Sequence, residues 1–248
     1  MTEAIGVELA VQRWGSGPKR ALLLHGIGSA AAGWWRLGPD LAELGFVVDG
    51  PDLRGHGLSP KPAEMSLEGY AEDVRHLGDH WDLVIAHSLG GSIVLAGGLA
   101  ASGWTERLVL EDPAILGSDD PEVVAWLLEE FDGPIDPATI ASSNPTWHPT
   151  DAALKAEALL QCGPEAIQRT MDHSGAWNLW DELLAVEVPT LLIGADPKLG
   201  ALVSPELGQT AAAGNPRIRY ESVVGASHSM HRDEYDTFWT LVQEFAAE

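Results

Sequence analysis

The sequence predicts an α/β protein with a doubly wound, mostly parallel sheet and a helical cap insertion. Short apolar runs recur along the chain, and helix-length segments separate them, which is the spacing of crossover helices between parallel strands. Most of the runs are continuous rather than alternating, as expected of strands covered on both faces. The strands predicted in this way cover residues 21–24, 46–48, 83–85, 108–110, 190–193 and about 218–224.

The first predicted strand differs from the others because its apolar residues alternate. Residues 5–14 place Ile5, Val7, Leu9 and Val11 on one face. This period of two predicts a strand that is half exposed.

The interval between Pro113 and Val188 contains no comparable apolar run. Glycine and proline divide it into helix-like pieces, which are Pro121–Phe131, Asp151–Gln161 and Pro164–His173. We therefore expect residues 114–186 to form a helical cap over the C-terminal edge of the sheet, where ligands bind in open α/β sheets. Residues 1–113 and 187–248 would then form the core. A helical subdomain packed elsewhere is the alternative.

Composition excludes several classes of protein. The chain has 248 residues, of which 45% are hydrophobic and 21% charged, so it suits one large folded domain. Its net charge of −23 would repel phosphate backbones and anionic membranes, so no nucleic-acid or membrane partner is expected. No stretch has the length of a membrane span, no signal pattern opens the chain, and the single cysteine, Cys162, precludes an internal disulfide. These features predict a soluble, cytoplasmic monomer or homodimer.

The segment LVIAHSLGGS, residues 83–92, indicates a nucleophile. A short apolar strand runs into Ser88, and small residues follow where a helix begins. Such a strand–turn–helix exposes a serine hydroxyl on a tight turn, and it aims the backbone N–H of Leu89 at a developing oxyanion. Ala86 stands where the G-x-S-x-G pattern has its first glycine.

A second segment, LLLHGIGSAAAGW at residues 22–34, predicts the other half of an oxyanion hole. Its loop of small residues can direct the backbone N–H of Ile27 to the same point as Leu89. An ordinary glycine-rich turn is the alternative interpretation. We expect His25 to be structural, with hydrogen bonds to loop backbone.

The segment GPDLRGHGLS, residues 50–59, is interpreted as scaffold. Asp52, Arg54 and His56 follow the end of a predicted strand, and their polar groups can satisfy one another and order the loop. A catalytic role for His56 is the less favoured alternative.

A base is predicted from VVGASHSMHRDEYDTFW, residues 223–239. His228 lies on the loop after the last predicted strand, from which it can reach back over the sheet to Ser88. His231 competes for this role, but it lies farther from the strand end. We expect His231 on the helix surface or at the rim of the pocket.

Together these segments resemble the α/β-hydrolase superfamily. HGIG, DLRGHGLS, AHSLGG and GASH occur in that family's order and at its approximate spacing, across residues 20–240. The resemblance implies a serine nucleophile, an acid and a histidine base in the chain order Ser, acid, His. The chain looks closest to the capped hydrolases of esters and lactones. A haloalkane dehalogenase would need an acid at position 88.

The acid that orients His228 has three candidates. The family usually places it after the strand PTLLIG, residues 189–194, but the expected slot falls near Gly200 and the only carboxylate nearby is Asp196. The family's second arrangement places it after the preceding strand, about two dozen residues beyond the nucleophile. There Asp112 lies 24 residues after Ser88 and Glu111 lies 23 after it. We favour Asp112 and keep Asp196 and Glu111 as alternatives.

These residues predict acyl transfer to water through an acyl-enzyme on Ser88, with no metal or organic cofactor. A small, largely apolar ester or lactone suits a pocket lined by the residues of the insertion, namely Trp126, Leu127, Leu128, Trp147, Leu159, Leu160, Met171, Trp177 and Trp180. A C–C hydrolase or a cofactor-free haloperoxidase can use the same Ser–His machinery. A non-catalytic receptor of this fold is the alternative from another class.

Overall fold

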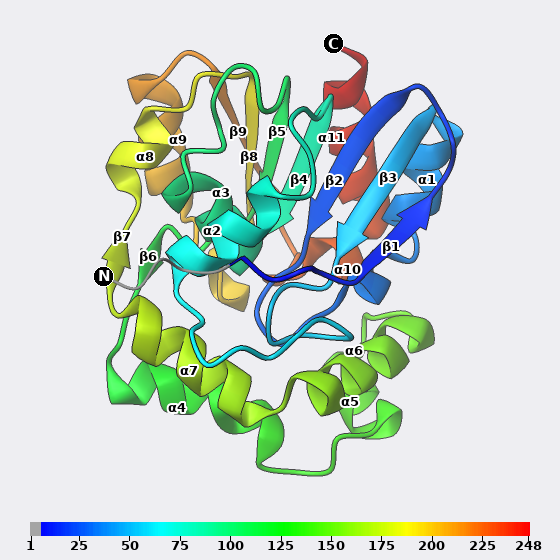
Figure 1. Cartoon of the computed structure of the whole chain (residues 1–248), viewed down its shortest axis with the longest axis vertical. Helices are drawn as coiled ribbons and strands as arrows, with labels where there is room; N and C mark the ends of the chain where they lie inside the picture. The colour runs from blue at the N-terminus through cyan, green and yellow to red at the C-terminus, as the bar shows by residue number, and fades with distance from the viewer. Residues whose placement is uncertain (1–5) are drawn as a thin grey trace.

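A seven-stranded sheet forms the centre of the computed structural model, which describes residues 6–248 (Figure 1). Its spatial order is β1-β3-β2-β4-β5-β8-β9. Neighbouring strands are parallel except for β1, which pairs antiparallel with β3 at the edge. The strands are β1 (Val11–Trp14), β2 (Lys19–Leu24), β3 (Phe46–Pro51), β4 (Leu83–His87), β5 (Leu108–Glu111), β8 (Thr190–Gly194) and β9 (Ile218–Ser222).

All six of these predicted runs contribute strands of this sheet, with β9 ending at Ser222, but the alternating segment was predicted too long. Within 5–14 only Val11–Trp14 is a strand, and Ile5 lies outside the described residues. The backbone just before β1 bonds to a loop instead, because Ala10 N–H donates to Ser59 Oγ at 2.8 Å and Ala10 C=O accepts from Asp52 N–H at 2.9 Å. Of the residues predicted to share one face, Leu9 is buried and Val7 half-buried, whereas Val11 is 41% exposed.

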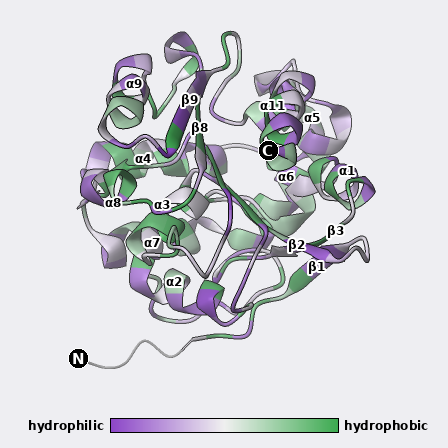
Figure 2. Ribbon diagram, turned by 90° about the horizontal axis from the view of Figure 1, so that it is seen from above, coloured by the Kyte–Doolittle hydropathy of each residue, from purple (hydrophilic) through white to green (hydrophobic). Residues whose placement is uncertain are grey.

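Helices cover both faces of the sheet (Figure 2). On one face, α1 (Leu37–Glu43) and α11 (Tyr235–Ala247) bury apolar side chains against the strands, together with the short α10 (Met230–Asp233). The other face packs against α2 (Leu67–Arg75), α3 (Leu89–Ala96), α8 (Trp180–Leu184) and α9 (Pro205–Gly214). Burial on both sides explains why the strand sequences are continuous apolar runs.

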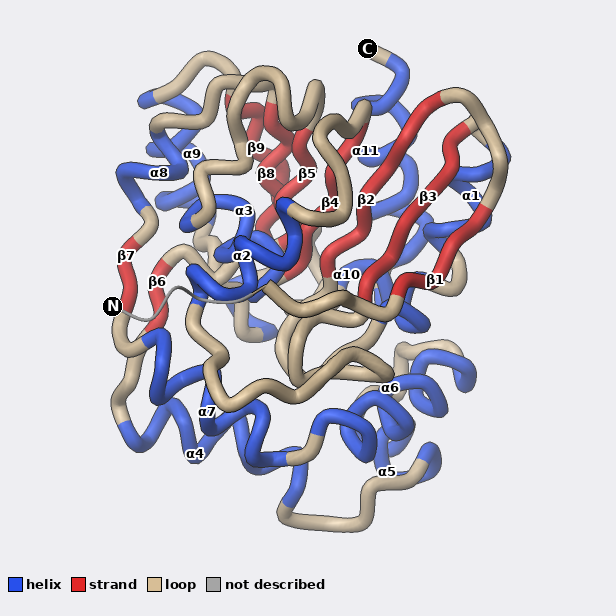
Figure 3. Tube along the Cα trace, viewed as in Figure 1, coloured by secondary structure: helices blue, strands red, loops and turns tan. Residues whose placement is uncertain are grey.

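Four helices of residues 114–186 lie beyond the carboxyl ends of the parallel strands, with loops between them and the sheet (Figure 3). They are α4 (Pro121–Leu128), α5 (Pro137–Ser143), α6 (Pro149–Cys162) and α7 (Pro164–Ser174), and a 3₁₀ turn at Glu129–Phe131 follows α4. The three predicted helices are present. Helices α5 and α8 were not predicted, because seven and five residues are too few to show a clear period.

A two-residue ribbon joins the two ends of this helical segment. Strand β6 (Leu116–Gly117) pairs antiparallel with β7 (Trp177–Asn178), and Trp177 Nε1 donates to Ala114 C=O at 2.8 Å. Strands this short leave no periodic signal, so they were not predicted. Among the described residues, no helix is both long enough and apolar enough to span a membrane.

Candidate active site

Ser88 occupies a strained turn between β4 and α3. Its backbone has φ 51° and ψ −115°, a conformation that side-chain-bearing residues rarely adopt. The turn is held by hydrogen bonds, since Ser88 N–H donates to Glu111 C=O at 3.0 Å and Ser88 C=O accepts from Gly91 N–H at 3.0 Å. This is the strand–turn–helix expected of a nucleophilic serine.

Small residues make this turn sterically feasible. A Cβ atom at Gly90 would lie 2.5 Å from the carbonyl oxygen of Leu24, and one at Gly91 would lie 2.6 Å from Cβ of Pro113. Ala86 is fully buried in β4, so a methyl group is accommodated where the pattern has its first glycine. Glycine is therefore required after the serine but not before it.

The loop after β2 forms a β-turn beside Ser88, which we call the oxyanion turn (Gly26–Ser29) after the role expected for the N–H of Ile27. Ser29 N–H donates to Gly26 C=O at 3.3 Å, and Gly28 has φ +65°, which suits the third position of a type II turn. A Cβ atom at Gly26 would lie 3.0 Å from Cβ of Ser88, so the turn and the serine are in close contact. Within the described residues, the Ile27 N–H has no acceptor.

The N–H and C=O groups of Gly28 in this turn have hydrogen-bond partners elsewhere in the protein. Gly28 N–H donates to Nε2 of His56 at 3.1 Å, and Gly28 C=O accepts from Nζ of Lys155 at 3.1 Å. The N–H of Leu89, at the start of α3, also donates to no described atom. Two backbone donors, those of Ile27 and Leu89, are thus left free at the turn and at the serine.

His25 and His56 are buried, neutral scaffold residues, as expected. His25 Nε2 accepts from Leu53 N–H at 3.0 Å, while its Nδ1 donates to Gly26 C=O at 2.8 Å. His56 Nδ1 donates to Arg54 C=O at 2.9 Å. Burial lowers the pKa of His25 to about 4 and that of His56 to about 3, so each accepts one hydrogen bond and donates another.

The charged residues of the 50–59 segment do not pair with one another, which corrects that part of the prediction. Arg54 reaches instead to Asp73 in α2, with Nε 2.6 Å from Oδ2, and to Glu64. Asp52 accepts from backbone N–H groups, those of Ala31 and Leu58, both at 2.8 Å. Asp73 and Ala31 lie about twenty residues from the side chains they bond to, and sequence spacing alone does not reveal such partners.

His228 and Asp112 are brought together from the two sides of β8. Nδ1 of His228 lies 2.7 Å from Oδ2 of Asp112, whose side chain is fully buried. The carboxylate also accepts from the N–H groups of Leu202 and Val203, at 3.0 and 2.9 Å. Asp112 has φ +39°, so the chain turns sharply at the end of β5 to direct this carboxylate at the imidazole.

His87, the residue before Ser88, ties the loop of His228 to the serine turn. Its Nε2 donates to the carbonyl oxygen of His228 at 2.9 Å, and the two imidazole rings lie 4.6 Å apart. Burial lowers the pKa of His87 well below its ordinary value, so the ring is neutral. Nucleophile and base candidates are thereby connected through one side chain.

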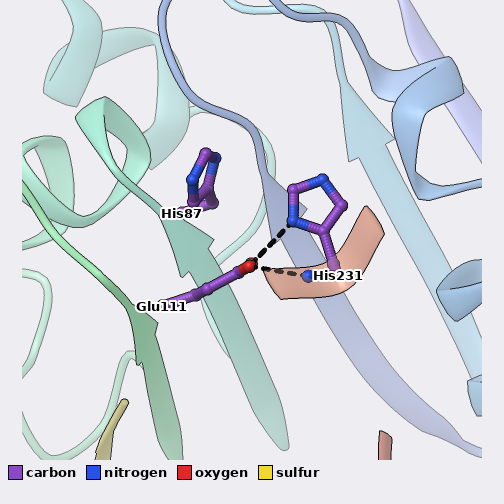
Figure 4. A group of neighbouring side chains, drawn as sticks. All are labelled: His87, Glu111 and His231. Carbon is purple, nitrogen blue, oxygen red and sulfur yellow. Dashed lines mark hydrogen bonds and ion pairs between the residues drawn. The ribbon is translucent and has the colours of Figure 1, made fainter. Parts of the chain in front are cut away.

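Glu111 bonds to His231, whereas Asp112 bonds to His228. Its carboxyl group accepts from the backbone N–H and from Nδ1 of His231, both at 2.9 Å (Figure 4). His231 is only 5% exposed, which overturns its expected position on a helix surface or a pocket rim. Burial raises the pKa of Glu111 to about 8 and lowers that of His231 well below its ordinary value.

His87, Glu111 and His231 have the donor types of a metal site, with ligand atoms within 4.8 Å of one another. Each donor already has a partner in the protein, because Glu111 bonds to His231 and His87 bonds to the backbone of His228. The group is therefore satisfied as a hydrogen-bonded cluster behind the serine turn.

Asp196 lies apart from this cluster. Its carboxylate accepts from the N–H groups of Lys198 and Gly225, at 2.9 and 3.0 Å, and these bonds lower its pKa. It caps the 3₁₀ turn at Pro197–Leu199 and has no hydrogen bond to His228. Among the three acid candidates, only Asp112 contacts the imidazole of His228.

The apolar residues expected to line a pocket have different environments. Leu159 and Met171 are buried, whereas Trp126 and Leu160 are 60% and 66% exposed. Leu127, Leu128, Trp177 and Trp180 are half-buried against the apolar core. Trp126 and Leu160 therefore face solvent and do not contribute to a buried lining.

A sequence model of the alpha/beta hydrolase family matches residues 21–240, and the chain belongs to that family. The resemblance drawn from four short motifs is thereby confirmed. The strand–turn–helix at Ser88 is the serine turn typical of α/β-hydrolases.

Among characterised relatives, the chain is 35% identical to the lipase LipV of Mycobacterium tuberculosis over 58% of each protein, so it spans little more than half of that lipase. It is 26% identical to the N-formylmaleamate deformylase of Pseudomonas putida, over 98% of this chain and 94% of the deformylase. The enol-lactonase from Burkholderia xenovorans has a similar fold, with a TM-score of 0.78 and 24% identity over 97% and 96% of the two chains. The esterase from Exiguobacterium antarcticum also has a similar fold, with a TM-score of 0.76 and 20% identity over 98% of this chain and 97% of the esterase.

Proposed function

We propose that the protein is a serine hydrolase that cleaves a carboxylic ester or lactone of a small, largely apolar molecule. Ser88 is the nucleophile, His228 the general base and Asp112 the acid that orients it. The observation that carries this proposal is the 2.7 Å contact between His228 and the buried Asp112, on a loop that His87 links to the strained turn of Ser88. Esterases, lipases and lactonases among the relatives favour the same chemistry.

In the proposed first step, Ser88 Oγ attacks the substrate carbonyl while His228 takes its proton. The N–H groups of Ile27 and Leu89 stabilise the oxyanion, which their lack of other acceptors supports. Collapse of the tetrahedral intermediate releases the alcohol, which receives its proton from His228. Water activated by His228 then attacks the acyl-enzyme and regenerates Ser88. No step requires a metal ion or a cofactor.

Asp112 is assigned to orient His228 because it accepts from Nδ1 of that ring, leaving Nε2 to act on the serine proton. The N–H groups of Leu202 and Val203 stabilise the charged carboxylate in its buried position. The imidazolium that forms during reaction would gain a neighbouring negative charge. Glu111 is not assigned this role, because its carboxyl group bonds to His231.

Residues 114–186 are proposed to act as a cap on the core formed by residues 1–113 and 187–248. Its helices α4 to α7 lie beyond the carboxyl ends of the strands that lead to Ser88 and Asp112 (Figure 1), whereas α8 packs against a face of the sheet. Lys155 of α6 also donates to the oxyanion turn. A cap in this position would exclude water and supply the apolar surface for the substrate.

Hydrolysis of a C–N bond is a second candidate. It is favoured by the similarity to N-formylmaleamate deformylase, which extends over 98% of the chain. The same three residues would serve, with His228 protonating a departing nitrogen in place of an alcohol.

Hydrolysis of p-nitrophenyl butanoate by the purified protein tests the proposal. We expect turnover that a serine-directed organophosphate abolishes, with mass spectrometry locating the adduct on Ser88. A matched p-nitroanilide of butanoic acid distinguishes ester from amide cleavage. Labelling at another residue would refute the assignment of the nucleophile, and binding without turnover of either compound would favour a receptor.

A further inference from the structure

Two buried basic side chains flank the oxyanion turn. Arg232 of α10 and Lys155 of α6 are 5% and 7% exposed, although the chain carries a net charge of −23. Nη2 of Arg232 donates to Ser29 Oγ at 2.9 Å, and Nζ of Lys155 donates to Gly28 C=O at 3.1 Å. Positive charge is thus concentrated beside the carbonyl-binding end of the proposed site.

Arg232 lacks the carboxylate partner that buried arginines ordinarily have. Its guanidinium lies 4.7 Å from the ring of Trp147, and its Nε is buried without an acceptor in the part of the chain described by the structure. The acidic residue that acts on it most strongly, Asp151, is engaged by Arg36 at 2.7 Å. A buried cation in this state has capacity for an added anion.

Lys155 has a partner that can be displaced. Its Nζ lies 2.7 Å from a carboxylate oxygen of Glu130, whose side chain is 44% exposed on the 3₁₀ turn after α4. Glu130 can turn into solvent, whereas the buried Lys155 needs a neutralising partner. An incoming carboxylate could therefore replace Glu130 and keep Lys155 neutralised.

We propose that Arg232 and Lys155 form a subsite for a carboxylate carried by the substrate. This inference rests on the proposed ester or lactone hydrolysis and adds one charged group to an otherwise apolar substrate. Ile27 N–H and Ser29 belong to one β-turn, whose ends lie within about 7 Å of each other. The carboxylate would accordingly be separated from the scissile carbonyl by a short chain of carbon atoms. Half-esters of short dicarboxylic acids have this form.

Two esters of equal length test the subsite. They are p-nitrophenyl hydrogen glutarate, which carries a carboxylate on its acyl chain, and p-nitrophenyl pentanoate, which does not. We expect the wild-type protein to prefer the charged ester in kcat/KM. The ratio of the two values should fall roughly tenfold to a hundredfold in Arg232→Gln, which loses a charge-assisted hydrogen bond, and to a smaller extent in Lys155→Met.

Arg169→Gln is the matched control, because Arg169 is an exposed cation of α7 that pairs with Glu165. It should leave the preference for the charged ester intact. Arg232→Lys, which keeps the charge but loses the planar donor set, should retain part of the preference. Equal losses on both esters in Arg232→Gln would show that Arg232 only supports the oxyanion turn, and would overturn the proposal.

Calorimetric titration with free glutarate tests the subsite without turnover. We expect binding to the wild-type and Arg169→Gln proteins, and weaker binding to Arg232→Gln. Absence of glutarate binding, or equal binding to all three, would overturn the subsite even if both esters are cleaved. Binding of glutarate without cleavage of either ester would support the subsite and reject the proposed hydrolase activity.

Discussion

Nδ1 of His228 lies 2.7 Å from a carboxylate oxygen of Asp112, although 116 positions separate the two residues in the chain. The parallel sheet produces this contact, because β5 ends at Glu111 next to β8, and the loop after β9 carries His228 back toward the same edge. Because Nδ1 is engaged in this hydrogen bond, Nε2 is the ring nitrogen that remains available for Ser88.

Ser88→Ala is expected to reduce ester hydrolysis at least about a thousandfold while leaving the unfolding temperature nearly unchanged. The hydroxyl lies on a turn, and alanine occupies the same strained φ of 51°. Ser88→Gly should remove activity equally but raise the unfolding temperature above that of Ser88→Ala, because glycine adopts this conformation without strain. Kinetic assays and thermal melts check both points. Residual turnover above about a tenth of wild type would exclude Ser88 as nucleophile.

Asp112→Asn should lower kcat by several orders of magnitude, because the amide stabilises the wrong tautomer of His228 and carries no charge. Asparagine tolerates positive φ, so the turn at 39° should be preserved. The measurement is kcat at one pH for purified, folded protein.

Asp196→Asn is the control for this substitution, since its carboxylate only caps a turn. It should retain wild-type kcat. If Asp196→Asn were the impaired variant and Asp112→Asn the active one, the acid would follow the usual position of the family after β8.

Gly26→Ala tests the contact between the oxyanion turn and the serine. Its Cβ would lie 2.8 Å from Nδ1 of His87 and 3.0 Å from Cβ of Ser88, so one of these groups must move. We expect kcat to fall at least about tenfold, because small displacements of reacting groups are costly. Gly133→Ala, where an added Cβ meets nothing within 4 Å, is the control and should behave as wild type. Equal activity of both variants would argue against an oxyanion role for this turn.

Glu111→Gln should change how stability depends on pH. The pKa of Glu111 is raised from 4.5 to about 8 in the folded protein, so between these values the folded state holds a proton that the unfolded state has lost. The free energy of unfolding contributed by this group therefore falls as the pH rises, by about 1.4 kcal/mol per pH unit.

Glutamine cannot ionise, so the variant should lose this contribution and become more stable relative to wild type as the pH rises from about 5 to 8. Denaturant unfolding at several pH values measures the difference. Parallel pH profiles for the two proteins would show that Glu111 is already ionised in the folded state.

The sequence predicted the sheet well because strands buried on both faces leave continuous apolar runs, as in residues 83–85 and 190–193. It overestimated the first strand because Ala10 bonds to a loop and Val7 bonds to Asp73 of α2, instead of to a neighbouring strand. Helix α5 and the β6–β7 ribbon were missed because short elements depend on tertiary contacts rather than on periodicity.

The strained turn at Ser88 and the place of His228 on the loop after the last strand were predicted because their neighbouring sequences are distinctive. The sequence favoured Asp112 as the acid but kept Glu111 as an alternative, since the two are adjacent and their directions depend on a backbone turn with φ +39°. The position of His231 was predicted wrongly because its partner, Glu111, is 120 residues away. Arg232 gave no signal, since an arginine before an aspartate suggests a surface position.

The loop after β8 supplies Asp112 with two backbone amides, those of Leu202 and Val203, and with no side chain. Every amino acid except proline has such an amide. The side chain of Leu202, which is 43% exposed, can therefore change during evolution without loss of the backbone bond to the carboxylate, provided that proline is avoided. Val203 is instead constrained by its burial in the apolar core, so a designer seeking new binding contacts here would vary Leu202 and keep Val203.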